Sequence, residues 1–157
     1  MARRRRAERR EKAPDRKYNS ELVAHFISKV MERGKRSVAE MIIYGALDTI
    51  KSKMPEQDPL EVLVRAVDNV KPRVEVKSRR VGGATYQVPV EVGAVRARAL
   101  ALRWLIQYAQ ARKGVPMQQG LALEFMDAYK TQGNAIKKRD DTHKMAQANR
   151  AFAHYRW

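Results

Sequence analysis

The chain has 157 residues, a length typical of a single domain that buries a substantial core. Its 33 Lys and Arg residues outnumber its 17 Asp and Glu residues, and the resulting formal net charge of +16 makes nucleic acid the expected partner. The chain has no cysteine, which excludes disulfides and thiolate metal sites, and no apolar run approaches the roughly 20 residues that span a membrane.

Residues 1–17 are dense in arginine and have almost no large apolar side chains. Such a segment buries too little apolar surface to offset the entropy of ordering, so we expect a flexible arm in the free protein. The remaining residues, 18–157, are predicted to form one helical domain. The arginines of the arm are expected to bind RNA phosphates: Arg3, Arg4, Arg5, Arg6, Arg9 and Arg10. The alternative is a basic terminus that only solubilises the protein.

The first predicted helix starts at Asn19 or Ser20 and runs to Arg33, where Gly34 ends it. Apolar residues recur within it at the spacing of one helical face, which predicts that this face is buried. These residues are Leu22, Phe26, Ile27 and Val30.

Two further helices are predicted before Pro72. The second starts at Ser37, whose hydroxyl is expected to form a capping box with Glu40, and ends before residue 55. The third opens at Asp58–Pro59, because proline fits the first helical position, where an N–H is not needed. The residues expected on the buried sides are Val38, Met41, Ile42 and Ile50 in the second helix, and Leu60, Leu63, Val64 and Val67 in the third.

Residues 73–92 are predicted to form a basic β-hairpin, because two valine-rich halves alternate apolar with polar residues around Gly82-Gly83. A loop of two glycines would place Val76 opposite Pro89 and give each face a mixed character. A loop of about three residues would instead place Val74, Val76 and Ser78 opposite Val92, Val90 and Val88. We predict this second register because it gathers the valines on one face.

The charged tip of this hairpin is expected to contact RNA and to order fully on its partner, since an isolated two-stranded ribbon is only marginally stable. The alternative is a hairpin that lies flat on the body with solvated charges.

Three more helices follow the hairpin. Residues 94–112 carry an apolar stripe of Val95, Ala99, Leu102 and Ile106, flanked by Arg96, Arg98 and Arg103. Residues 117–130 place Leu121, Phe125 and Met126 inward. A basic C-terminal helix over about residues 135–153 has a thin apolar stripe, which favours a position on RNA or another partner. The predicted fold is mainly α: one bundle of about six helices with a protruding two-stranded antiparallel β-hairpin between helices three and four.

No catalytic or metal-binding pattern is present in the sequence. His25, His143 and His154 are far apart and no paired-histidine spacing occurs. The pair Asp140-Asp141 is interpreted as a salt-bridged or helix N-terminal feature. There is no phosphate-binding loop and no nucleophile beside a base, so we expect neither an enzyme, a cofactor, a metal nor a small-molecule substrate.

Aromatic residues lie beside basic ones at two places in the sequence. Tyr86 is expected either to stack on a base or a guanidinium group, or to pack on the body of the protein. Trp104 is interpreted as a residue of the core or its rim rather than as a stacking platform. The closing segment, residues 151–157, is expected either to dock or to contact ribose and phosphate.

Five blocks of sequence together resemble one protein family. They are GKR at residues 34–36, RVEVKSRRVGG at 73–83, YQVP at 86–89, LRWL at 102–105 and ANRAFAHYRW at 148–157. The chain resembles the small-subunit ribosomal protein seven family of the bacterial and organellar type along nearly its whole length. It departs from that pattern at residues 94–96, which are Ala-Val-Arg where the family commonly has Pro-Arg-Arg.

The resemblance implies a six-helix bundle that binds the 3′ major domain of small-subunit rRNA and initiates assembly of the subunit head. It also implies a position near the decoding region and the tRNA exit site, with the hairpin and C-terminal helix facing exit-site tRNA and mRNA. Ribosomal proteins nine and eleven would be neighbours. The expected location is the ribosome of the cytoplasm, or of an organelle matrix or stroma.

Combining the resemblance with the charge pattern predicts two sets of contacts. Besides the arginines of the arm, the rRNA-binding residues are expected to be Lys35, Arg36, Arg73, Lys77, Arg79, Tyr86, Arg96, Arg98 and Arg103. The residues expected to face tRNA and mRNA are Arg79, Arg80, Gly82, Gly83, Lys144, Arg150, Tyr155 and Arg156.

Two other classes of protein share part of this pattern. A basic DNA- or RNA-architectural protein outside the ribosome would have the same charge and arm. An RNA-processing enzyme would require a catalytic constellation. Neither class accounts for the five matching blocks.

Overall fold

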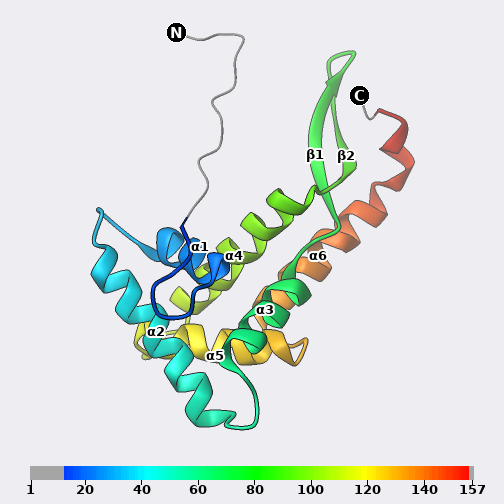
Figure 1. Cartoon of the computed structure of the whole chain (residues 1–157). Coiled ribbons are helices and arrows are strands. Elements are labelled where there is room, and N and C mark those ends of the chain that lie inside the picture. Colours follow the sequence, from blue (N-terminus) through cyan, green and yellow to red (C-terminus); the bar gives the residue numbers. More distant parts are fainter. Residues whose placement is uncertain (1–12, 156–157) are drawn as a thin grey trace, which may run out of the picture.

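The computed structural model describes residues 13–155, and it confirms the predicted fold class (Figure 1). Within this range the elements in chain order are α1 (Glu21–Val30), α2 (Arg36–Lys53), α3 (Pro59–Val70), β1 (Val74–Val81), β2 (Ala84–Glu91), α4 (Ala94–Gln110), α5 (Met117–Tyr129), α6 (Asn134–Ala148) and a closing 3-10 helix, η1 (Arg150–Tyr155). The two strands form an antiparallel hairpin that projects from the helices between α3 and α4.

Helix α5 lies at the centre of the bundle and packs against α2, α3 and α4. Phe125 of α5 meets Phe26 of α1 edge to face, with ring centroids 5.2 Å apart and both side chains fully buried. A Cβ atom at Gly120 would lie 2.9 Å from the carbonyl oxygen of Ala109, so glycine permits α4 and α5 to approach this closely. The predicted inward residues of α5, Leu121 among them, are buried as expected.

Two helix starts and one helix end test the predicted boundaries. The side chain of Asp58 accepts a hydrogen bond from the N–H of Leu60 and proline occupies the first turn, as predicted for α3. The prediction that Ser37 forms a capping box is wrong, because α2 begins one residue earlier, at Arg36. Helix α1 ends at Val30, three residues before the predicted end.

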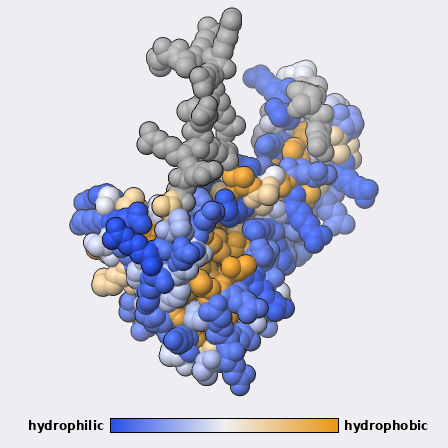
Figure 2. Space-filling model, viewed as in Figure 1, coloured by the Kyte–Doolittle hydropathy of each residue, from blue (hydrophilic) through white to orange (hydrophobic). Residues whose placement is uncertain are grey.

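The buried faces of three helices differ in part from the prediction. Val38, Met41, Val64 and Val95 are 44%, 63%, 46% and 52% exposed, so their assignment to the core was wrong. In α2 the buried side instead contains alanines with Ile43 and Leu47. Apolar residues surround much of α2, and the small alanine side chains admit neighbouring helices more closely than Met41 would. Figure 2 shows apolar residues in a band on one face of the molecule, bordered by hydrophilic ones.

The hairpin adopts the register that was not predicted. Val76 lies opposite Pro89, and Lys77 opposite Val88, so the loop contains only Gly82 and Gly83. The φ angles of these glycines are 55° and 90°, and two consecutive positive values match the twist that a two-residue hairpin loop requires. Turn chemistry therefore outweighed the gain from gathering the valines on one face.

Helix α6 packs along the hairpin and against α3, α4 and α5. Its thin apolar stripe suffices because the buried residues are few and mostly small: Ala135, Ile136, Thr142 and Ala146. The predicted continuous helix to residue 153 is interrupted at Asn149, after which the chain continues as η1. Among residues 13–155, no helix has both the length and the apolar character needed to cross a membrane.

Candidate nucleic-acid interface

The loop between α1 and α2 presents the basic pair Lys35 and Arg36. Both residues are exposed, because Arg33 and Gly34 have positive φ angles and turn the chain away from α1. The guanidinium Nε of Arg36 donates to the carboxylate of Glu40 at 2.7 Å. An exposed ion pair of this kind contributes little to stability, so Arg36 can exchange Glu40 for a phosphate group.

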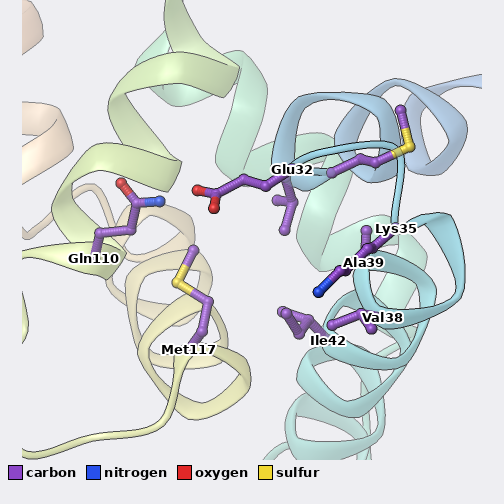
Figure 3. Close-up of a pocket in the computed structure, with 9 residues that line it drawn as sticks. Glu32, Lys35, Val38, Ala39, Ile42, Gln110 and Met117 are labelled. Carbon is purple, nitrogen blue, oxygen red and sulfur yellow. The ribbon is translucent and has the colours of Figure 1, made fainter.

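A pocket of about 260 Å³ lies beside this loop, at the ends of α1 and α4 and the starts of α2 and α5. Figure 3 shows Lys35 pointing into it, the carboxylate of Glu32 directed toward Gln110, and the apolar side chains of Ile42 and Met117 on opposite sides. The lining contains one carboxylate and no histidine. The pocket therefore offers contact surface beside the basic loop.

Helices α1 and α4 form a second basic surface. Arg103 of α4 is exposed and lines a shallow groove with Lys29 of α1 and the amide side chains of Gln107 and Gln110. Arg98, five residues before Arg103, is half-buried. The groove combines positive charge with amide donors, groups that bind phosphate and ribose oxygens.

The hairpin carries basic residues along β1. Arg73, Lys77 and Arg80 are exposed, Arg79 is half-buried, and the glycines of the tip are exposed. Lys77 lies 3.6 Å from the carboxylate of Glu75 and is the weaker of two cations paired with it. The hairpin therefore presents positive charge along its length and an open backbone at its tip.

Glu75 and Arg96 form a bidentate ion pair that joins the hairpin to α4. Arg96 donates from Nε to Oε1 at 2.7 Å and from Nη2 to Oε2 at 2.8 Å, and Glu75 is only 8% exposed. Hydrogen bonding from Arg96 holds the pKa of Glu75 below its usual value, against the effect of burial. Arg96, expected to bind rRNA, thus has an internal partner that fixes the hairpin.

A second connection lies at the base of the hairpin. The backbone N–H of Arg73 donates to Nε2 of His143 in α6 at 3.0 Å. Burial and the nearby charge of Arg139 lower the pKa of His143, which favours the neutral ring that this hydrogen bond needs. His143 therefore has a structural contact, and no metal-binding group of three His, Asp or Glu residues exists among residues 13–155.

Near the tip, the hairpin is joined to the C-terminal segment by aromatic rings. The ring centroid of Tyr86 lies 5.3 Å from that of Phe152 and 5.0 Å from that of Tyr155. Tyr86 therefore packs on the C-terminal segment, and its expected contact with RNA stays a prediction. Lys144 of α6 and Arg150 of η1 are exposed.

Several expected contact residues lie outside the described residues. They are the arginines of the arm, Arg3, Arg4, Arg5, Arg6, Arg9 and Arg10, and the C-terminal Arg156. The described chain begins close to a firm anchor, however. Asp15 is 2% exposed and accepts hydrogen bonds from the hydroxyl of Tyr44 at 2.6 Å and from the N–H groups of Lys17 and Tyr18. Burial, together with the bond to Asp15, raises the pKa of Tyr44 to about 12.

One buried ionic cluster was not predicted from the sequence. Glu124 of α5 is fully buried, and Arg112 donates to its Oε2 from Nε at 3.1 Å and from Nη2 at 2.7 Å. Arg112 also contacts Asp127, and the N–H of Ala135 donates to Glu124 Oε1 at 3.1 Å. A glutamate inside the apolar run of residues 121–126 was the available signal, because a buried charge requires a partner. Arg112 therefore stabilises the fold.

The acidic pair Asp140-Asp141, which was predicted to be salt-bridged or to lie at a helix N-terminus, is salt-bridged at one of its two residues. Asp140 forms an ion pair with Arg139 at 2.6 Å, while Asp141 is exposed. Arg139 also donates to the backbone carbonyl of Asn69 at the end of α3. Asp140 therefore orients a cation that links α6 to α3.

Comparison with known proteins identifies the family. The model of the family described as ribosomal protein S7p/S5e matches residues 2–150. The chain belongs to the S7p/S5e family of ribosomal proteins. It is 59% identical over 157 residues to small ribosomal subunit protein uS7 of Akkermansia muciniphila, covering 100% of both chains. It is 60% identical over 155 residues to uS7 of Thermotoga neapolitana, covering 99% of both, and 55% identical over 157 residues to uS7 of Desulfotalea psychrophila, covering 100% of both.

Membership of the S7p/S5e family confirms the resemblance found in the sequence. The chain is a protein of the small ribosomal subunit, and rRNA binding and a role in translation follow from the family. The family is structural and not enzymatic, so the expectation of a non-enzyme is confirmed. The ribosomal location is confirmed in the same way.

Proposed function

We propose that this chain binds the 3′ major domain of small-subunit rRNA directly and nucleates assembly of the subunit head. The observation that carries the proposal is family membership, combined with three exposed basic surfaces on one small bundle. These surfaces are the Lys35–Arg36 loop, the groove between α1 and α4 with Arg103, and the hairpin. They lie on several different elements, which suits a partner that is itself folded.

The mechanism is neutralisation of phosphates at an RNA junction, with release of counterions. A protein that neutralises 6–10 phosphates loses roughly a thousandfold or more in affinity between 50 and 200 mM salt. Side chains do not reach the bases through the deep major groove of A-form RNA, so specificity would come from the junction's shape and from unpaired bases. The arginines of residues 3–10 would follow the backbone beyond the body.

We further propose that the hairpin tip and the C-terminal segment face exit-site tRNA and mRNA. Support comes from their position: the tip projects from the bundle and exposes Arg80, Gly82 and Gly83, and the basic residues Lys144 and Arg150 are exposed on the adjoining C-terminal elements. The glycines let a nucleic-acid backbone approach closely, since they carry no side chain. Ribosomal proteins nine and eleven are the proposed neighbours.

A competition experiment tests the rRNA proposal. The labelled 3′ major domain transcript is bound to the full chain and challenged with an unlabelled 5′ domain transcript of matched length, and separately with duplex DNA. The proposal expects both competitors to be at least a hundredfold weaker than unlabelled 3′ major domain RNA. Equal displacement by duplex DNA would instead support a general architectural protein.

A further inference from the structure

The C-terminal 3-10 helix lies against the second strand of the hairpin (Figure 1). Its residues Arg150 and Ala153 line a pocket with Val74 and Glu91 at the base of the ribbon. Two rings of this helix, Phe152 and Tyr155, flank Tyr86 at centroid distances of 5.3 and 5.0 Å. All three residues are half-buried, although they belong to a projecting arm and to the end of the described chain. The partial burial shows that the rings shield one another from water.

The 3-10 helix η1 is also stabilised by contacts among its own residues. The ring of His154 lies 3.9 Å from that of Tyr155, and its Nδ1 is 2.9 Å from the carbonyl oxygen of Ala151. The N–H of Phe152 donates to the carbonyl of Asn149, which ties η1 to the end of α6. The rings that contact Tyr86 are therefore presented by a short but internally bonded segment.

The hairpin requires such support. A two-stranded ribbon alone is marginally stable in water, and this one has a mixed register in which Lys77 lies opposite Val88. At its base it is held by Glu75 to Arg96 and by Arg73 to His143. Those contacts and the packing of α6 along the hairpin hold the lower part of the ribbon, and the contacts of η1 with β2 hold it nearer the tip.

We propose that η1 is a splint that holds the hairpin in one orientation in the free protein, with Phe152 and Tyr155 as positioning residues that act through Tyr86. The tip is then ordered before it meets a partner. This differs from the sequence-based expectation that the tip orders fully on its partner. A pre-oriented tip binds without the entropy cost of immobilising an arm.

The absence of cysteine from the chain permits a direct test. Thr85→Cys on β2 and Gln107→Cys on α4, both at exposed positions, would carry spin labels for pulsed electron resonance distance measurement. The full chain without RNA is expected to give one narrow distance distribution. Phe152→Ala and Tyr86→Ala are each expected to broaden it, and the double variant to broaden it no more than Tyr86→Ala alone.

Matched variants separate ring packing from general damage. Tyr86→Phe and Tyr155→Phe keep the rings and should keep the narrow distribution, and Ala151→Ser changes an exposed neighbour in the same helix and should do likewise. Hydrogen exchange of the β1 and β2 amides should accelerate about two- to tenfold for each ring pair lost. The proposal would be overturned if Phe152→Ala and Tyr86→Ala left the distance distribution unchanged. It would also be overturned if the labelled chain without these substitutions gave a broad distribution. Because no RNA is present, this outcome is independent of the proposed rRNA binding.

Discussion

The buried pair of Arg112 and Glu124 gives the sharpest test of the fold. Arg112→Met removes both hydrogen bonds to a carboxylate that is fully buried and leaves it only the N–H of Ala135. Breaking one partner of a buried ion pair costs about 3–5 kcal/mol. The side chain of Arg112 is 26% exposed, so water reaches the site and we expect the lower end, about 3 kcal/mol.

Urea unfolding followed by circular dichroism at neutral pH measures this loss in the free energy of unfolding, and thermal unfolding gives the matching shift in melting temperature. For a protein of this size, 1 kcal/mol corresponds to a shift in melting temperature of roughly 2–4 °C, so Arg112→Met should melt roughly 6–12 °C lower. The double variant Arg112→Met with Glu124→Leu removes the stranded charge and should recover much of the loss. A change below about 0.5 kcal/mol in Arg112→Met would refute the reasoning, because it would mean that Glu124 is solvated or paired elsewhere.

Three further predictions concern the hairpin. Arg79→Ala with Arg80→Ala should leave rRNA binding largely intact but reduce retention of exit-site tRNA; normal retention would remove the role proposed for the tip. NMR of the carboxyl carbon of Glu75 should give a pKa below the usual 4.5, because Arg96 donates hydrogen bonds to this carboxylate. Arg96→Ala should shift the pKa of Glu75 upward. The ion pair therefore stabilises the hairpin above pH 4.5, and this stabilisation is lost as the pH falls through the lowered pKa. The imidazole of His143 should have a pKa below 6.5, because burial and Arg139 disfavour the charged ring more than Asp140 favours it. The hydrogen bond from the N–H of Arg73 is therefore present above pH 6.5 and is lost as the pH falls through the lowered pKa. A titration midpoint above pH 6.5 would contradict the burial of His143.

Much of the bundle could be predicted because local signals and tertiary packing agree. Asp58 followed by proline marks the start of α3, and the apolar spacing of residues 121–126 marks the inward face of α5. The exposed face of α2 could not be predicted in the same way. Val38 and Met41 extend an apolar pattern around the helix, and only the position of its neighbours determines which side is covered.

The site was harder to predict than the fold. The exposed cations Lys35, Arg36 and Arg103 follow from composition and motif, but the partners of Arg96 and Arg112 lie 21 and 12 residues away in sequence. An isolated sequence does not distinguish an arginine that binds phosphate from one that binds a buried carboxylate. The prediction of the hairpin register was wrong for a related reason. The alternation of valines suggested a single apolar face, whereas the ribbon is held by an ion pair and by aromatic rings.

Hydroxyl-radical footprinting on naked small-subunit rRNA tests the central claim most directly. The account predicts one cluster of protected riboses within the 3′ major domain, which persists when excess unrelated RNA is added. It also predicts that Arg103→Ala with Lys35→Ala weakens this cluster, whereas Arg79→Ala with Arg80→Ala leaves most of it unchanged. Protection scattered over several domains, or protection that unrelated RNA abolishes, would contradict the account.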